Sequence, residues 1–179
     1  MAAILEIKTS DEADWHGLQA AAYQILVTQG RRANGRSFHD GCFYDLLTHT
    51  YHIGAEALVS VTQALTRAGR IDATWFTEES RQRGTLVHDI AFHMDLRGVR
   101  WSGSWPSTID GYGEAYRAFC HDMKPTYHYS EEPFWHVTER FGGRPDRVVE
   151  AFNGRSVDGR FLLYLQPNGK PKLRRCKRA

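Results

Sequence analysis

The stretch AILEIKT, residues 3–9, combines the character of a buried strand with two charged residues. Its apolar, partly β-branched residues, Ile4 and Ile7 among them, predict a short strand in the interior of a sheet. Glu6 and Lys8 are two positions apart, so their side chains point to the same face of that strand. A buried carboxylate or ammonium group is costly unless it is paired or bound to a metal ion. The stretch therefore indicates either a structural ion pair or part of a charged site.

The segments that follow this strand predict a mixed α/β domain with a central sheet flanked by helices. We expect helices over Asp14–Gln29, between the N-cap Ser60 and Gly69, from the N-cap Thr77 to Arg97, and over Asp110–Met123. We expect strands at 42–45, 50–53, 127–137, 143–152, 160–166 and 170–176. The Asn-Gly dipeptide at 168–169 is a hairpin turn that should pair the last two strands. Residues 30–41 are polar and glycine-containing, which predicts a linker.

The length and composition bound the class of protein. A chain of 179 residues fits a single α/β domain, residues 1–179, with a substantial core. Apolar residues make up 41% and charged residues 25%, as in an ordinary soluble globular protein. No stretch resembles a membrane span or a cleaved leader, so we expect a cytoplasmic protein. Cys42, Cys120 and Cys176 are far apart and odd in number, which argues against disulfides and against a zinc or iron–sulfur site.

Polar residues that could take part in catalysis or binding occur at three further places, although each also has an ordinary structural explanation. Asp146 follows a proline at the head of an apolar strand, where Pro-Asp commonly marks a turn. His88 lies four residues after Gly84 on an expected helix, and a mid-helix glycine, which costs about 1 kcal/mol, suggests a close approach on that face. A lone helical histidine is most often a surface or core residue. Gln19 and Tyr23 share one helix face, as an ordinary polar stripe beside the core also would.

Taken together, these residues resemble the PD-(D/E)xK nuclease superfamily in its RecB-like exonuclease branch. In that family a helical histidine, an aspartate after a glycine-rich approach, a (D/E)-x-K strand and a Gln-x-x-x-Tyr helix surround one site. The matching residues here are His88, Asp146, Glu6-Ile7-Lys8, and Gln19 with Tyr23. Residues 43–63 are similar to the family's opening hairpin and first helix, and Glu131 stands where the family has an acidic residue on a core strand. The resemblance implies a restriction-endonuclease-like core, with a mixed central β-sheet flanked by helices.

The order of the motifs differs from the family order, because the (D/E)-x-K strand and the Gln/Tyr helix come first. The tetrapeptide Asn-Gly-Arg-Ser occurs at 34–37 and again at 153–156, and moving the N-terminal segment to the second copy restores the family order. We therefore expect a circularly permuted domain: a strand–helix unit at 1–29, a linker at 30–41 and the remainder of the core at 42–179. The N-terminal strand should dock antiparallel to the aspartate strand and parallel to the strand that begins near residue 160. We expect this docking within one chain, with a swapped dimer as the alternative.

The resemblance implies a metal-dependent deoxyribonuclease, more specifically an exonuclease, that hydrolyses phosphodiester bonds by a metal-activated water. The cofactor would be Mg²⁺ or Mn²⁺. Its ligands would be the Asp146 and Glu6 carboxylates, the Ile7 carbonyl oxygen and His88, whose imidazole favours Mn²⁺.

Four more residues have roles that the same resemblance implies. Lys8 would hold the attacking water or stabilise developing charge. Gln19 and Tyr23 would position Lys8 or the phosphate, and Glu131 would orient metal-bound water or complete the metal shell. Three alternatives remain open: an endonuclease, a catalytically inactive DNA-binding module on the same fold, and an unrelated α/β binding protein in which Glu6 and Lys8 are only an ion pair.

The basic C-terminal run indicates the expected partner. Six of the nine residues from Lys170 to Arg178 are basic, and on a strand Lys170, Lys172 and Arg174 share one face. We expect these three residues to contact DNA phosphates, although a solvated tail has the same composition. The expected partners are DNA and not a membrane. The chain has no helicase region, so any motor would be a separate helicase or recombination protein.

Overall fold

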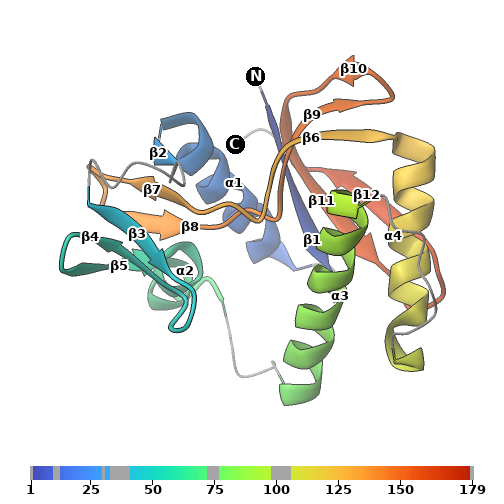
Figure 1. Ribbon diagram of the computed structural model, residues 1–179, viewed down its shortest axis with the longest axis horizontal. Helices are drawn as coiled ribbons and strands as arrows, with labels where there is room; N and C mark the ends of the chain where they lie inside the picture. Colours follow the sequence, from blue (N-terminus) through green and yellow to red (C-terminus); the bar gives the residue numbers. More distant parts are fainter. Residues whose placement is uncertain are drawn as a thin grey trace.

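The computed structural model describes residues 2–9, 13–29, 31–32, 41–71, 77–97 and 106–177, which form a mixed α/β structure with two mixed sheets (Figure 1). The helices are α1 (Asp14–Gln29), α2 (Val61–Arg67), α3 (Glu78–Arg97) and α4 (Asp110–Met123), with a short 3-10 helix η3 (Ser107–Ile109). The larger sheet contains β1 (Ala3–Lys8), β6 (Pro125–Ser130), β9 (Arg147–Phe152), β10 (Arg155–Ser156), β11 (Gly159–Leu165) and β12 (Pro171–Arg175). The smaller sheet contains β2 (Arg31–Arg32), β3 (Cys42–Asp45), β4 (Thr50–Ile53), β5 (Glu56–Ser60), β7 (Phe134–His136) and β8 (Phe141–Gly143).

Strand β1 lies in the interior of the larger sheet, between β9 and β11. It runs antiparallel to β9, with Ala3 opposite Val149, and parallel to β11, with Ala3 opposite Gly159. Residues 3–7 are all buried, as a strand covered on both faces should be. The interior position of this strand and the directions of its two neighbours are therefore as predicted.

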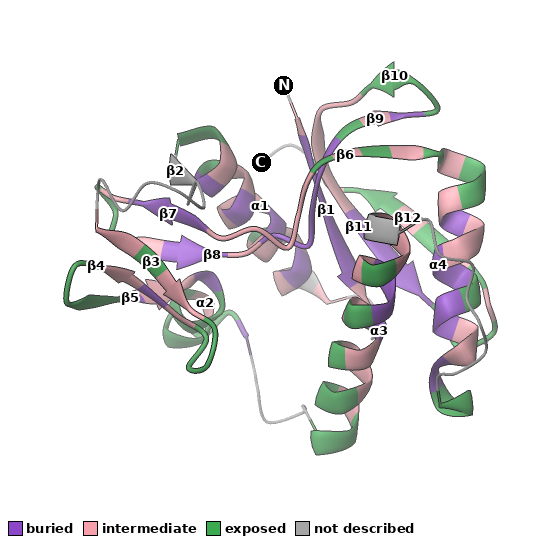
Figure 2. Ribbon diagram, viewed as in Figure 1, coloured by how far each residue is buried: buried purple, intermediate pink, exposed green. Residues whose placement is uncertain are grey.

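Helices cover both faces of the larger sheet (Figure 1). On one face, Leu5 and Ile7 of β1 belong to a hydrophobic core that includes residues of α3 and α4. On the other face, Ile4 packs with Ala20 and Leu26 of α1. The alternation of side chains along the strand sends neighbouring residues into different cores, so the buried interior in Figure 2 is divided by the sheet.

The local signals for most elements are confirmed. The hairpin of β3 and β4, the two last strands and the helices α1, α3 and α4 lie where they were expected. Ser60 caps α2 in a capping box, because its hydroxyl accepts from the Gln63 amide while the Gln63 side chain accepts from the Ser60 amide. Thr77 accepts from the Ser80 amide at the start of α3.

The single strand predicted over 127–137 is wrong, because the chain forms two shorter strands there, in different sheets. The strand predicted over 143–152 begins too early, because Gly143 ends β8 and the next strand, β9, covers only Arg147–Phe152. β6 and β9 belong to the larger sheet, whereas β7 and β8 belong to the smaller one. The first break falls at Glu131, whose φ of 53° cannot continue a strand. The second falls at residues 144–146, where Pro145 offers no amide to a ladder. The Glu131 amide donates to the Asp146 carbonyl at 3.0 Å, so the two breaks lie side by side where the sheets meet.

The predicted linker at 30–41 is described only in part. Arg31–Arg32 form a short strand that pairs with β7, whereas residues 30 and 33–40 lie outside the described part of the chain. In the ranges that the structure describes, no helix combines the length and the apolar character needed to cross a membrane.

Candidate metal centre

Three possible ligands converge where the two sheets meet. His88 comes from α3, Glu131 from the break between β6 and β7, and Asp146 from the residue before β9. One potential ligand atom from each lies within 4.8 Å of the others. The His88 Nδ1 is 3.4 Å from a Glu131 oxygen and 3.5 Å from an Asp146 oxygen. One imidazole and two carboxylates form a donor set suited to Mn²⁺ or Mg²⁺.

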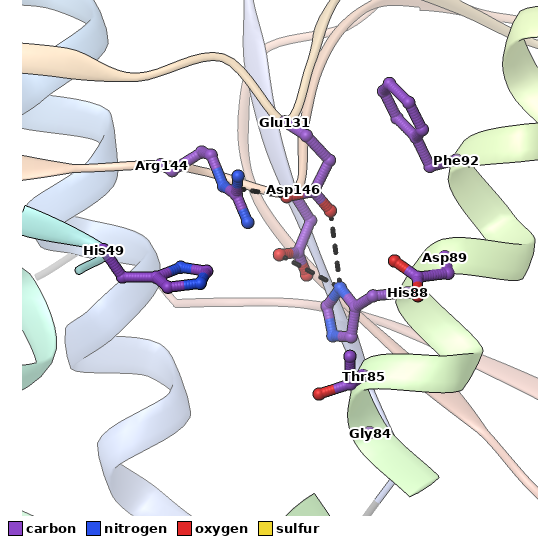
Figure 3. Close-up of a pocket in the computed structure, with 9 residues that line it drawn as sticks. All are labelled: His49, Gly84, Thr85, His88, Asp89, Phe92, Glu131, Arg144 and Asp146. Atoms are coloured by element: carbon purple, nitrogen blue, oxygen red, sulfur yellow. Dashed lines mark hydrogen bonds and ion pairs between the residues drawn. The ribbon is translucent and has the colours of Figure 1, made fainter. Parts of the chain in front are cut away.

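These three residues line a pocket of about 590 Å³ (Figure 3). Its remaining walls are formed by His49, Gly84, Thr85, Asp89, Phe92 and Arg144. A Cβ added at Gly84 would meet only the Thr9 hydroxyl, at 4.0 Å. The predicted close approach of a protein group to Gly84 is therefore wrong for the described residues, and the absent side chain instead leaves the pocket wall open.

Asp146 connects the pocket to β1 because the sheet opens beside it. The ladder between β1 and β9 ends at Leu5 opposite Arg147. Beyond that pair, the Ile7 amide donates to Asp146 Oδ2 at 2.6 Å, and the Asp146 amide donates to Glu6 Oε1 at 3.1 Å. The two strands separate, and the Asp146 carboxylate satisfies a backbone amide that would otherwise be buried without an acceptor.

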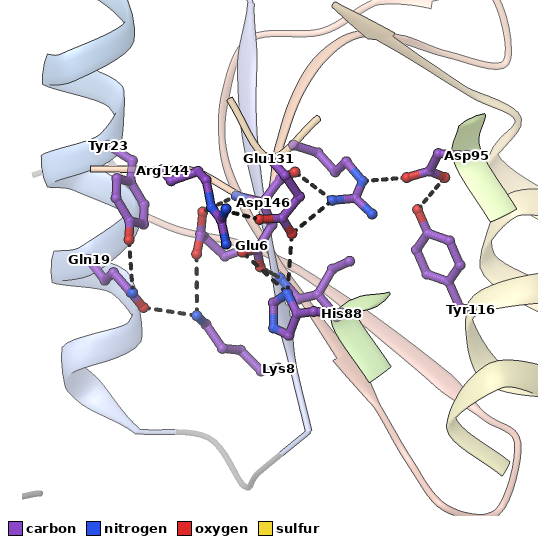
Figure 4. Close-up of polar contacts among 12 residues, drawn as sticks. Glu6, Lys8, Gln19, Tyr23, His88, Asp95, Tyr116, Glu131, Arg144 and Asp146 are labelled. Carbon is purple, nitrogen blue, oxygen red and sulfur yellow. Dashed lines mark hydrogen bonds and ion pairs between the residues drawn. The ribbon is translucent and has the colours of Figure 1, made fainter. Parts of the chain in front are cut away.

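A second polar group lies on the α1 side of Asp146 (Figure 4). The Lys8 ammonium is 3.3 Å from Glu6 and donates to the Gln19 side chain at 2.8 Å. The Gln19 amide then donates to the Tyr23 hydroxyl at 3.3 Å. Gly143 allows this packing, because a Cβ there would lie 2.6 Å from the Tyr23 ring. We call Glu6, Lys8, Gln19 and Tyr23 the lysine group.

A buried arginine supports the pocket from the opposite direction. The Arg147 side chain is fully buried, and it pairs with Asp95 and, at 3.2 Å, with Glu131. Its guanidinium also donates to the Asp146 carbonyl at 2.6 Å and lies over the Tyr127 ring. Arg147 therefore holds the two backbone breaks together and supplies positive charge behind the two carboxylates.

Burial and mutual repulsion shift the protonation of the site. Burial, with a further contribution from the Asp146 charge, raises the pKa of Glu6 to about 8. Burial alone would lower the pKa of His88, but the carboxylates of Asp146 and Glu131 outweigh it and raise the pKa above its ordinary value. The Asp146 charge contributes to both shifts, and a cation bound at that carboxylate would oppose this contribution.

The structure brings together all the site residues expected near β1, but it places them in two groups rather than around one metal position. Glu131, not Glu6, joins His88 and Asp146 in the converging donors of the described chain. Glu6 faces Lys8 and the Asp146 amide, and Ile7 meets Asp146 through its amide.

The three basic residues of the C-terminal hairpin do not line this pocket. Lys170, Lys172 and Arg174 are all exposed, and the last two lie on the edge strand β12. In the register, Lys172 follows Tyr164 and Lys8 across the sheet, so it shares a sheet face with the lysine group.

Sequence reasoning missed four residues around the pocket. Arg147 carries a signal, because a charged residue at the head of the apolar strand at 147–152 needs a buried partner. Its partner Asp95 and the pocket residues His49 and Arg144 carry no comparable pattern, since tertiary contacts alone bring them here.

Comparisons of the chain with protein-family models, with curated proteins and with solved structures find no match.

Proposed function

We propose that this protein is a metal-dependent DNA nuclease that hydrolyses phosphodiester bonds. The observation that carries the proposal is the convergence of His88, Glu131 and Asp146 on an open pocket, with Asp146 also bonded to the strand that bears Glu6 and Lys8. A structural ion pair between Glu6 and Lys8 needs none of these neighbours.

The donor set fits a divalent cation. Carboxylate oxygens suit both Mg²⁺ and Mn²⁺, and the imidazole of His88 tilts the preference towards Mn²⁺. The pKa of Glu6 is raised mainly by burial, and the smaller contribution of the Asp146 charge is the part that a nearby cation would offset. When bound, the ion would neutralise phosphate charge and make a coordinated water more acidic.

The lysine group would supply a positioned cation. Lys8 lies close enough to His88 for their charges to interact, and Gln19 fixes the direction of its ammonium. An ammonium held in this way can orient a water or stabilise charge that develops on a phosphoryl oxygen. Tyr23 acts through Gln19, so we regard it as a positioning residue.

The sheet supports the finer fold assignment that the proposal includes. A restriction-endonuclease-like core with permuted segments requires β1 between an antiparallel aspartate strand and a parallel strand, and β9 and β11 have these directions. β9 ends at Phe152 and β11 begins at Gly159, so the permuted order demands no long loop between these two strands. We include the PD-(D/E)xK family and the circular permutation in the proposal on these grounds.

Digestion of linear and circular DNA with Mg²⁺ and with Mn²⁺ tests the proposal. We expect linear DNA to be degraded and closed circular DNA to be spared, as by an exonuclease, with Asp146→Asn as the inactive control. Cleavage of the circle would make the protein an endonuclease. Binding of DNA without cleavage in either metal would favour an inactive DNA-binding module, and neither binding nor cleavage would reject the proposal.

A further inference from the structure

An arginine and a histidine side chain lie on the pocket wall that faces the candidate metal centre. Arg144 lies between β8 and β9, and His49 ends the turn between β3 and β4. Both line the pocket, and in Figure 3 they lie across it from the α3 residues Thr85 and His88. The pocket thus has an acidic side and a side rich in hydrogen-bond donors.

Tyr44 holds both of these side chains in place. Its hydroxyl is 2.9 Å from the His49 Nδ1, and the Arg144 guanidinium lies 5.6 Å from the centre of its ring. Tyr44 itself packs on Tyr51, with the ring centres 4.8 Å apart. His49 has a φ of 54°, an uncommon conformation for a residue other than glycine, so the turn accepts some strain to place this imidazole.

The orientation leaves suitable donors for an anion. The Tyr44 hydroxyl occupies the His49 Nδ1, so Nε2 can donate to an anion in the tautomer that places a proton there. The Arg144 Nε is 3.2 Å from a Glu131 oxygen, which leaves the two terminal nitrogens of the guanidinium to bind a ligand. The Arg144 side chain is one-third exposed.

The need to neutralise the Glu131 carboxylate does not by itself explain why Arg144 lies beside it. Arg147, which is fully buried, already pairs with the other oxygen of the same carboxylate at 3.2 Å. Arg144 is therefore a second cation on one carboxylate, at the edge that opens to the pocket. A forked guanidinium beside a metal centre matches the geometry of two phosphate oxygens.

We propose that Arg144 and His49 form a phosphate-binding subsite that holds non-bridging oxygens of a DNA phosphodiester beside the metal centre. This inference rests on the proposed function and adds the residues that bind the substrate's anionic group. Arg144 would be the main contact, and Tyr44 would act as a positioning residue for both side chains.

Binding of a short fluorescein-labelled DNA, single-stranded and duplex, tests this subsite by anisotropy in Ca²⁺ across a range of salt concentrations. Arg144→Gln should raise the Kd about tenfold and reduce the log–log salt slope by about one unit. Arg144→Lys should keep the slope but recover only part of the affinity, because it retains the charge and loses the fork. His49→Gln should weaken binding less than Arg144→Gln does.

Arg140→Gln is the matched control. Arg140 pairs with Glu56 and does not line the pocket, so the same charge is removed four residues away. Mn²⁺ binding is measured on every variant and should survive in Arg144→Gln.

If Arg144→Gln and Arg140→Gln bind DNA equally well, the subsite is refuted while the nuclease proposal stands. Loss of Mn²⁺ binding in Arg144→Gln would also refute it, because Arg144 would then serve the metal ligands. A wild-type protein that binds neither form of DNA would remove this inference together with the proposed function.

Discussion

The two polar groups on either side of Asp146 differ in how their charges are balanced. In the lysine group, one ammonium meets Glu6 and Gln19 within a part-buried chain of contacts. On the α3 side, His88, Glu131 and Asp146 turn their ligand atoms towards each other and towards an open pocket. The first group closes on itself, whereas the second is arranged around a position that a cation could fill.

Because of this difference, we expect residues of the same type to have different roles in the two groups. Glu6 and Glu131 are both carboxylates near Asp146, but Glu6 is held by a lysine and a backbone amide. Glu131 is held by Arg147 from behind and by Arg144 at the edge of the pocket, and it faces the imidazole. The comparison predicts that the α3 side binds the metal and that the lysine group assists the chemistry.

The largest effect is expected when the residue shared by both groups is changed. Asp146→Asn should lower DNA cleavage at least about 1000-fold with the fold intact, because the amide can still accept from Ile7 but removes a metal-binding charge. Lys8→Ala should have a similar effect. Asp89→Asn, which alters a pocket carboxylate outside the converging set, should keep most activity in the same nuclease assay. Near-full activity of Asp146→Asn would reject the assignment.

Arg147, which is fully buried, and Lys8, which is half-buried, should differ in their contribution to stability. Arg147→Met leaves Asp95 and Glu131 without their buried partner and should cost about 3–5 kcal/mol in urea denaturation. Lys8→Met should cost less, because burial and Asp146 already raise the pKa of Glu6 to about 8 and the carboxyl can take up a proton instead. Equal losses in the free energy of unfolding for the two variants would contradict the proposed difference in charge balance between the two groups.

The basic residues at the edge strand β12 lie towards the same face of the larger sheet as the lysine group, and we expect them to contact DNA phosphates. Changing Lys170, Lys172 and Arg174 to Gln should flatten the salt dependence of DNA binding by about one log–log unit for each lost phosphate contact. Fluorescence anisotropy over a salt series measures this slope. An unchanged slope would make these residues an ordinary solvated surface.

The smallest expected effect is a pH dependence of stability without metal. A carboxyl whose folded-state pKa is raised stabilises the fold below its unfolded value near 4.5, and that contribution is lost as pH rises through about 8. His88 acts in the same direction, because its raised pKa also favours the protonated folded state. The Tm should therefore fall by a few degrees from pH 5 to pH 8.5, and less in Glu6→Gln. An identical pH profile for this variant would argue against a role of Glu6.

The sequence predicts the local elements well but not the division between the sheets. Caps such as Ser60 and the apolar strand at β1 act locally, so their patterns are sufficient. Both breaks carry a local signal, because Pro133 and Pro145 offer no amide to a ladder, but the sheet that each flanking strand joins depends on contacts between distant segments. Arg144 and His49 are exposed or half-buried loop residues, which no periodicity distinguishes. The charged motif residues were recognisable, and Glu131 was expected at the metal shell. The position of Glu6 outside the converging donors of the described residues required the three-dimensional arrangement.

Binding of Mn²⁺ to the wild type, Glu131→Gln and Glu6→Gln, followed by electron paramagnetic resonance, tests the central claim most directly. The account predicts that the wild type takes up Mn²⁺, that Glu131→Gln loses most of this affinity, and that Glu6→Gln retains more of it. Asp146→Asn serves as the variant in which binding should be weakest. Absence of Mn²⁺ uptake by the wild type, or loss of uptake in Glu6→Gln but not in Glu131→Gln, would contradict a metal centre at His88, Glu131 and Asp146.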